Sequence, residues 1–103
     1  MISYDNFQVS ADGKRAAALF PWPRSGMADL EKGEYSRMGR GCWTSMCPDN
    51  SYKMWVFDGA HQNLKIQIPG RMFRHSVSLM SAPGMSPSSE AYHPRWSNHH
   101  RYF

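Results

Sequence analysis

Histidine and cysteine are the residues of this chain that could bind a metal ion. His93, His99 and His100 lie within eight positions of one another, and a zinc site needs three or four ligands that converge on one point. The repeat described below places His93 at the start of a strand and the other two at its far end, so about 20 Å of strand would separate them. Cys42 and Cys47 would lie roughly 16 Å apart in an extended segment, too far for a disulfide bond. The sequence therefore predicts no metal site, no cofactor and no bond between the two cysteines.

Nucleophilic and acid–base catalysis find little support in the sequence. The chain contains no G-x-S-x-G elbow, no H-E-x-x-H motif and no phosphate-binding glycine loop. Asp12 and Asp49 are followed by Gly13 and Asn50, and an Asp in that position bonds to its own backbone and stabilises a turn. We therefore expect these four residues to be structural, which favours a non-catalytic chain.

The elements that would position any site are organised as a repeat. Three segments superpose on their turns: "FQVSADGK" (7–14), "TSMCPDNS" (44–51) and "PRWSNHHR" (94–101). The turn positions Asp12, Asp49 and His99 are separated by 37 and then 50 residues. Intervals of this length are typical of the blades of a β-propeller.

Each of the first two units offers four short strands. In the first, about residues 4–40, strands flank the Asp12-Gly13 turn and then a Lys32-Gly33 turn. In the second, about residues 41–80, "YKMWVF" is followed by "NLKIQI" and "RMFRHSVSL" on either side of Pro69-Gly70.

The remaining residues predict a loop and the start of a third unit. Residues 81–90 are rich in Ser and Pro, which indicates an irregular loop, and residues 91–103 resemble the beginning of a further blade. No segment shows a sustained helical period. The sequence thus predicts an all-β fold built from antiparallel four-stranded blades.

The composition and charge of the chain argue against disorder, nucleic-acid binding and a membrane span. The chain is 41% hydrophobic with a net charge of +4, which predicts a packed domain rather than a disordered one. Its twelve Lys and Arg residues are scattered, so we expect no nucleic-acid partner. The chain opens with "MISYD", which lacks the features of a signal peptide, and its longest apolar run, 16–20, is too short to span a membrane.

The turn motifs resemble those of a known family. "VSADGK", "MCPDNS" and the degenerate "WSNHHR" are similar to the W-S-P-D-G-K hairpin of TolB-like, WD-repeat-like β-propeller proteins. The resemblance covers essentially the whole chain, with Cys47 and Asn50 where Ser and Gly are usual. It implies an incomplete β-propeller and a periplasmic or extracellular location.

The resemblance also implies where a ligand would bind. In propellers the hairpins between the first two strands of each blade share one face, and the loops that share the opposite face usually bind ligands. Seven loop residues would then converge: Trp22, Arg24, Arg40, Asp58, His61, His93 and Arg95. Such a cationic and aromatic rim suits an anionic peptide or a sugar. The alternative is that Trp22 packs between blades and that the Arg side chains bind carbonyls at strand ends.

The implied function is binding of a protein, peptide or glycan by a propeller segment. A closed propeller needs at least four blades, so we expect the remaining blades to come from the same longer chain or from other copies. Two alternatives stay open. One is the propeller part of a hydrolase, glycosidase or lyase whose catalytic residues lie mostly outside this chain. The other is a small β-sandwich.

Overall fold

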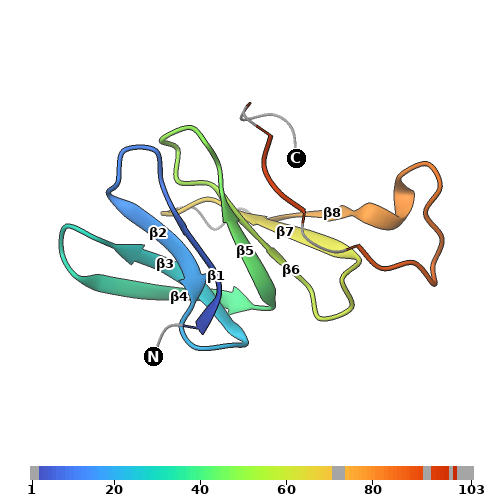
Figure 1. Cartoon of the computed structure of the whole chain (residues 1–103), viewed down its shortest axis with the longest axis horizontal. Coiled ribbons are helices and arrows are strands. Elements are labelled where there is room, and N and C mark those ends of the chain that lie inside the picture. The colour runs from blue at the N-terminus through green and yellow to red at the C-terminus, as the bar shows by residue number, and fades with distance from the viewer. Residues whose placement is uncertain (1–2, 71–73, 92–93, 98, 100–103) are drawn as a thin grey trace.

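Two four-stranded antiparallel sheets pack against each other (Figure 1). The computed structural model describes residues 3–70, 74–91, 94–97 and 99. The first sheet consists of β1 (Ser3–Val9), β2 (Arg15–Leu19), β3 (Arg24–Asp29) and β4 (Glu34–Arg40). The second consists of β5 (Cys42–Met46), β6 (Met54–Phe57), β7 (Asn63–Gln67) and β8 (Arg74–Ser78). A short 3-10 helix, η1 (Leu79–Ser81), follows β8. The predicted all-β fold is confirmed.

Each sheet is a simple meander because tight turns separate its strands. Within each sheet, every strand pairs with the next one along the chain. Gly33 and Gly70, between β3 and β4 and between β7 and β8, both have φ near +72°. Glycine adopts this left-handed conformation without steric cost. The Lys32-Gly33 and Pro69-Gly70 turns therefore lie where the sequence predicts them.

A methionine-rich layer joins the two sheets. Met46 of β5 and Met54 of β6 pack against Ala17 of β2 and Met27 of β3, and all four side chains are buried. The small alanine side chain of β2 leaves room for the long and adaptable methionines of the second sheet.

A glutamine fixes β5 against β1. The Oε1 atom of Gln8 accepts hydrogen bonds from the Ser45 hydroxyl at 2.8 Å and from the Met46 backbone amide at 2.7 Å. Ser45 and Met46 are both buried, so these donors need a partner within the protein. Gln8 therefore sets the relative position of the two sheets.

The opposite face of the second sheet carries the other hydrophobic cluster. Trp55, Phe57 and Leu64 are fully buried there, and Trp96 and Ala91 pack against them. The Trp96 indole donates a hydrogen bond to the Ser45 carbonyl at 3.3 Å, which fixes the C-terminal segment beside β5. Of the predicted third unit, the described residues (91, 94–97 and 99) are not in a strand.

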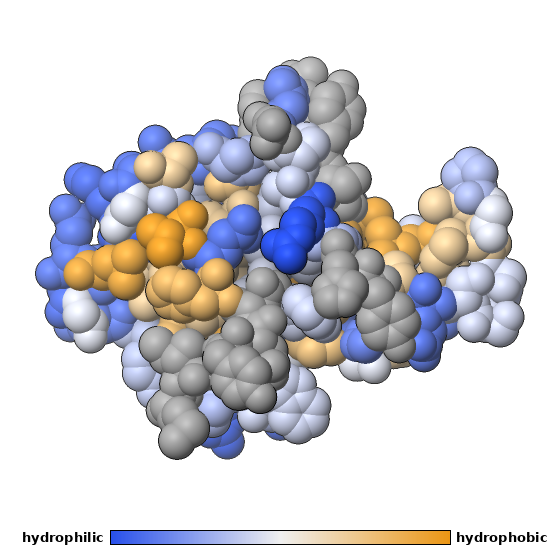
Figure 2. Space-filling view, in the orientation of Figure 1, coloured by the Kyte–Doolittle hydropathy of each residue, from blue (hydrophilic) through white to orange (hydrophobic). Residues whose placement is uncertain are grey.

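The outer face of the first sheet, on the side away from the second sheet, is open. Val9 and Tyr35 lie on this outer face and are 44% and 54% exposed. They belong to one row of register partners, Val9, Ala16, Ala28 and Tyr35. Hydrophobic side chains gather over these strands in Figure 2. The Tyr35 ring stacks on Phe20 with centroids 4.9 Å apart.

The β1–β2 and β5–β6 hairpins meet at one end of the molecule (Figure 1). The Asp12 carboxylate accepts hydrogen bonds from the Ser10 hydroxyl at 2.6 Å and from the Tyr52 hydroxyl at 2.5 Å. The Asp12 amide donates to the Asn50 side chain at 3.1 Å. Asp12 thus stabilises its own turn and also links the two hairpins.

The other predicted turn residues also have local roles. Gly13 has φ +73°, and Asp49 accepts hydrogen bonds from the amide and hydroxyl of Ser51. The His99 amide donates to the Ser97 hydroxyl at 3.0 Å. Asp49 and the His99 backbone thus make these bonds within their own turns, whereas Asp12 bonds both within its turn and to the second hairpin.

Replacing Asp12 with asparagine is expected to remove an acid-sensitive part of the protein's stability. Hydrogen bonds from Ser10, Tyr52 and the Lys14 amide lower the Asp12 pKa from 3.8 to about 2. A carboxyl with a depressed folded-state pKa stabilises the fold above its unfolded pKa and loses that contribution as the pH falls through the folded value. The wild type should therefore melt at a higher temperature than Asp12→Asn at neutral pH, and the difference should shrink between about pH 4 and pH 2.

Thermal unfolding followed by circular dichroism across this pH range tests the prediction. Tyr52→Phe is the matched variant, because it removes one hydrogen bond to the carboxylate and keeps the charge of Asp12. A difference between wild type and Asp12→Asn that stays constant down to pH 2 would contradict the assignment.

Candidate functional site

The loops at the end opposite the two hairpins contact one another (Figure 1). The Gly41 amide, between β4 and β5, donates to the Pro23 carbonyl of the β2–β3 loop at 2.9 Å. The Ala91 amide donates to the His61 carbonyl of the β6–β7 loop at 3.0 Å. The Gln62 side chain donates to the Pro87 carbonyl at 2.9 Å. These bonds join the β2–β3 loop to the β4–β5 junction, and the β6–β7 loop to residues 87–91.

A cavity of about 320 Å³ opens among these loops, and we call it the rim pocket. It is lined by Trp22, Pro23, Arg40, Gly41, Cys42, Gly59 and Lys65. Trp22 is 61% exposed, and Arg40 and Lys65 are exposed as well. An exposed indole beside two cationic side chains can bind a ligand that has both a flat surface and negative charge.

The predicted rim residues fall into two groups. Trp22 and Arg40 line the rim pocket, and Arg24 is the register partner of Arg40 at the start of β3. Arg95 is exposed and is not among the lining residues. His93 lies outside the described residues. The structure thus brings Trp22, Arg24 and Arg40 to one place and leaves Arg95 apart from the pocket lining.

Asp58, also predicted at the rim, is bonded within its own loop. Its carboxylate accepts hydrogen bonds from the Gln62 amide at 2.9 Å and from the Asn63 side chain at 2.6 Å. Partial burial raises the pKa of Asp58, but these bonds from Asn63 and Gln62 outweigh it and leave the pKa below its usual value. Asp58 therefore stays ionised at neutral pH and holds the β6–β7 loop in shape.

His61 and Cys42 form a side-chain pair at the edge of the rim pocket. The Nε2 atom of His61 lies 3.1 Å from the Cys42 sulfur, and the His61 ring packs against Phe57 with centroids 5.4 Å apart. Burial and the negative charge of Asp58 raise the pKa of the Cys42 thiol. Cys42 is thus a protonated thiol beside an imidazole at neutral pH.

The sequence predicts His61 but not Cys42 or Lys65 as members of this site. Cys42 is the first residue of β5 and Lys65 is in the middle of β7, and neither is among the seven loop residues predicted from the repeat. The packing of β7 beside the joint between the sheets brings them to the pocket. Neither cysteine is in a disulfide bond.

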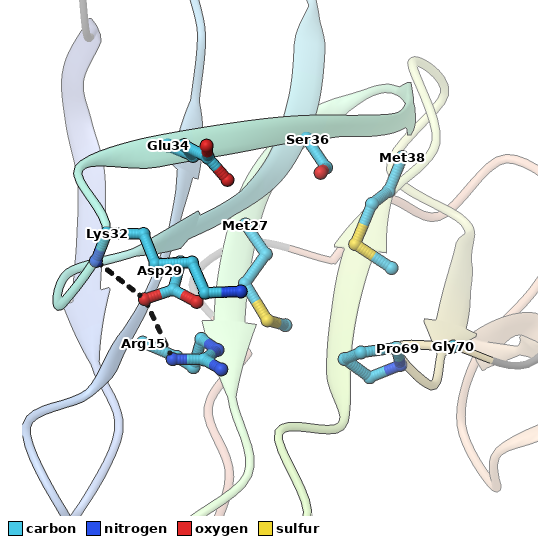
Figure 3. A pocket seen from close by; sticks show the side chains of 9 residues that line it. All are labelled: Arg15, Met27, Asp29, Lys32, Glu34, Ser36, Met38, Pro69 and Gly70. Carbon is cyan, nitrogen blue, oxygen red and sulfur yellow. Dashed lines mark hydrogen bonds and ion pairs between the residues drawn. The ribbon is translucent and has the colours of Figure 1, made fainter.

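A second cavity, of about 380 Å³, lies between the first sheet and the β7–β8 turn (Figure 3). Asp29 accepts hydrogen bonds there from the Arg15 guanidinium and the Lys32 amide, each at 3.1 Å. Met27 and Met38 supply apolar surface. Since Asp29 and Arg15 already bond to each other, this cavity offers less uncompensated charge than the rim pocket.

In residues 3–70, 74–91, 94–97 and 99, no group of three or more His, Cys, Asp and Glu side chains could hold a metal ion. Over the same part of the chain, no helix is long and apolar enough to cross a membrane. Comparison with protein-family models, curated proteins and solved structures finds no match to this chain.

Proposed function

We propose that this chain is a non-catalytic binding segment of a β-propeller resembling the TolB-like repeat proteins, and that the rim pocket binds an acidic peptide. The observation that carries the binding proposal is the meeting of Trp22, Arg40 and Lys65 at one cavity from three separate segments. The resemblance further points to a periplasmic or extracellular protein.

The relation between the two sheets supports the propeller part of the proposal. The Asp12 and Asn50 turns lie side by side at one end, and loops from both sheets meet at the other end. In addition, Trp96 packs on the second sheet as Met46 packs on the first. Val9, Met46 and Trp96 are equivalent positions of the repeat, so a similar packing step occurs twice.

The chemistry of the rim pocket supports an anionic ligand. Arg40 and Lys65 provide two positive charges, and a guanidinium can bind a carboxylate through two parallel hydrogen bonds. Trp22 provides a flat apolar surface for a neighbouring side chain. A glycan that carries carboxylates shares part of this chemistry, and we rank it second because Trp22 is the one aromatic residue among the described residues that line the pocket.

Arg40→Ala and Lys65→Ala are each expected to weaken binding of acidic peptides by roughly tenfold or more, because a hydrogen bond to a charged group contributes about 1.5–3 kcal/mol. Isothermal titration calorimetry with a panel of Asp- and Glu-rich peptides measures the loss. Peptides with Asn and Gln in place of Asp and Glu should bind weakly to the wild type.

Lys14→Ala is the matched control for charge. Lys14 is exposed at the hairpin end and pairs with Glu31 at 3.5 Å, so its removal changes the net charge equally at a distance from the rim pocket. If Lys14→Ala and Arg40→Ala weaken peptide binding equally, binding depends on the net charge of the protein and not on the rim pocket. Absence of binding to the whole panel would refute an acidic peptide as the ligand.

A further inference from the structure

Cys42 and His61 form a thiol–imidazole pair whose chemistry the binding function does not use. The Sγ and Nε2 atoms lie 3.1 Å apart, and the sulfur is also 3.6 Å from the Asp58 carbonyl oxygen. Cys42 is partly exposed and lines the rim pocket. The second cysteine, Cys47, directly follows the last residue of β5 and is buried. The two thiols of this chain therefore differ sharply in access.

The backbone around the pair holds both side chains in place. Trp43 has φ +52°, where the register of β5 against β6 shifts between Cys42 and Thr44. His61 has φ +56°, and its carbonyl accepts the Ala91 amide. Residues other than glycine are uncommon in this conformation. Bulges and strained residues of this kind gather at functional sites, where they direct side chains.

Several segments near Cys42 carry charged residues. Arg40 precedes it and Lys65 faces the same cavity from β7, while Asp58 is bonded within its own loop. Glu90 is next to Ala91, which bonds to His61. Among the residues that the structure describes, the cavity is lined by two cations and no carboxylate. Such a cavity concentrates anionic reagents near the thiol.

We propose that Cys42 exchanges with anionic low-molecular-weight disulfides that enter the rim pocket. Nε2 of His61 takes the proton of the Cys42 thiol, and Sγ attacks the nearer sulfur of the disulfide. The sulfur–sulfur bond of the reagent breaks as the bond to Sγ forms. The leaving thiolate then takes the proton from His61 and departs as a thiol. Exchange leaves the total number of thiols and disulfides unchanged, and a free thiol reverses it.

The His61 imidazole is needed because Cys42 is protonated at neutral pH. Burial and the Asp58 charge raise the thiol pKa, so the reactive thiolate is scarce without a base. In the tautomer with its proton on Nδ1, the Nε2 atom is the acceptor for the thiol proton. The positive charges of Arg40 and Lys65 favour the approach of a carboxylate-bearing reagent.

This inference shares the rim pocket with the proposed function but not its ligand. Disulfide exchange is measured as a covalent adduct by mass, and peptide binding is measured by calorimetry. One proposal can therefore be refuted while the other is confirmed. A chain that binds no acidic peptide could still form the mixed disulfide at Cys42.

Reaction of the full chain with disulfides of different charge tests the proposal. Glutathione disulfide carries carboxylates and a net negative charge, whereas cystamine carries amines, and both release alkyl thiols. At low ionic strength we expect Cys42 to react at least about tenfold faster with the anionic reagent. Intact-mass measurement should show one adduct, retained in Cys47→Ser and lost in Cys42→Ser. Serine is the residue at the equivalent position of the first hairpin, Ser10, so Cys47→Ser is a conservative control.

Two further variants separate the roles of the base and the cations. His61→Asn should slow exchange about tenfold or more, and asparagine tolerates the positive φ of this position. The double variant Arg40→Ala with Lys65→Ala should abolish the preference for anionic reagents and keep the reaction with cystamine. Unfolding midpoints equal to that of the wild type show that each variant is folded. If His61→Asn has a lower midpoint, the double variant alone tests the proposal.

Three results would overturn the proposal. The first is a Cys42 that reacts no faster than the buried Cys47. The second is an unchanged rate in a folded His61→Asn variant. The third is an equal rate with anionic and cationic disulfides in the wild type.

Discussion

Gly26→Ala is expected to lower the free energy of unfolding by about 3 kcal/mol, at the upper end of the usual cost of overpacking. A Cβ atom at Gly26 would lie 2.1 Å from the Ser36 carbonyl oxygen and 3.1 Å from the Arg37 Cα. Both are backbone atoms of β4, so no side-chain rotation can relieve the collision. Gly26 is in β3, between β2 and β4, so β4 would have to move away from its partner.

The displacement of β4 should also be visible in the outer face of the first sheet. The Arg37 guanidinium donates to the Phe20 carbonyl at 3.2 Å, and Tyr35 stacks on Phe20, so moving β4 breaks both contacts. Denaturant unfolding followed by tryptophan fluorescence and circular dichroism measures the loss of stability.

Gly59→Ala is the control for the glycine substitution. A Cβ atom at Gly59 has nothing within 4 Å, and its φ lies outside the left-handed region. Reduced freedom of the unfolded chain should make this variant as stable as wild type or slightly more so. Equal midpoints for Gly26→Ala and wild type would show that the close approach of β3 and β4 is not a feature of the protein.

Val9→Lys and Tyr35→Lys are expected to convert a self-associating chain into a monomer. Val9 and Tyr35 are about half exposed on the outer face of the first sheet, next to a shallow hollow of about 330 Å³ lined by Phe20, Ala28, Leu30 and Tyr35, among others. We expect two copies to meet through this outer face in an isologous contact. Each lysine should weaken association by about 2 kcal/mol, or roughly 30-fold.

The packing of the two sheets explains why the outer face should be covered. Val9 and Ala16 are register partners in the first sheet, as Met46 and Met54 are in the second. The methionine pair is buried against the first sheet. The outer face of the first sheet thus presents the same positions without a covering sheet among the described residues. In a longer propeller, a preceding blade would take the place of the second copy.

Sedimentation velocity over a wide range of concentrations tests this expectation. Trp22→Lys is the matched control, because Trp22 is a large and exposed hydrophobic residue at the rim pocket and not on the outer face. A wild-type chain that stays monomeric at all concentrations, with a single cooperative unfolding transition, would count against the outer face as an interface and against the propeller segment.

The strands were predictable because glycine and proline mark their ends. Asp12-Gly13, Lys32-Gly33 and Pro69-Gly70 each lie between two paired strands. Alternation of side chains was less informative, because β6 is buried on both faces, from Met54 to Phe57. A strand of this kind reads as a continuous apolar run and does not show which residues face the neighbouring sheet.

The two hairpins are less alike than their motifs suggest. The amide of Ser10 bonds to the Arg15 carbonyl, whereas the amide of Cys47 bonds to the Lys53 carbonyl, so the second hairpin is one residue longer. Tyr52 precedes Lys53 and has φ +59°, which places its hydroxyl on Asp12 and its ring beneath the Arg15 guanidinium. A superposition of motifs cannot show this extra residue, because it becomes visible only in the pairing of the strands.

The candidate site was predictable only in part. The repeat indicated Trp22 and Arg40, which line the rim pocket, because loops at one end of stacked sheets tend to meet. Asp58 has the expected location, but its hydrogen bonds are within its own loop, and a local sequence does not distinguish the two roles. Cys42 belongs to the site through its distance to His61, 19 residues away, which no local pattern encodes.

The joint between the sheets is a single residue, Gly41, between the last residue of β4 and the first of β5. A Cβ atom there would lie 1.9 Å from the Phe57 carbonyl oxygen. The backbone of the joint is therefore in close contact with the second sheet, which restricts hinge motion between the two sheets. The rim pocket spans this joint. The rim pocket is thus preformed. Ligand binding therefore costs little conformational entropy, because the two sheets do not have to close around the ligand.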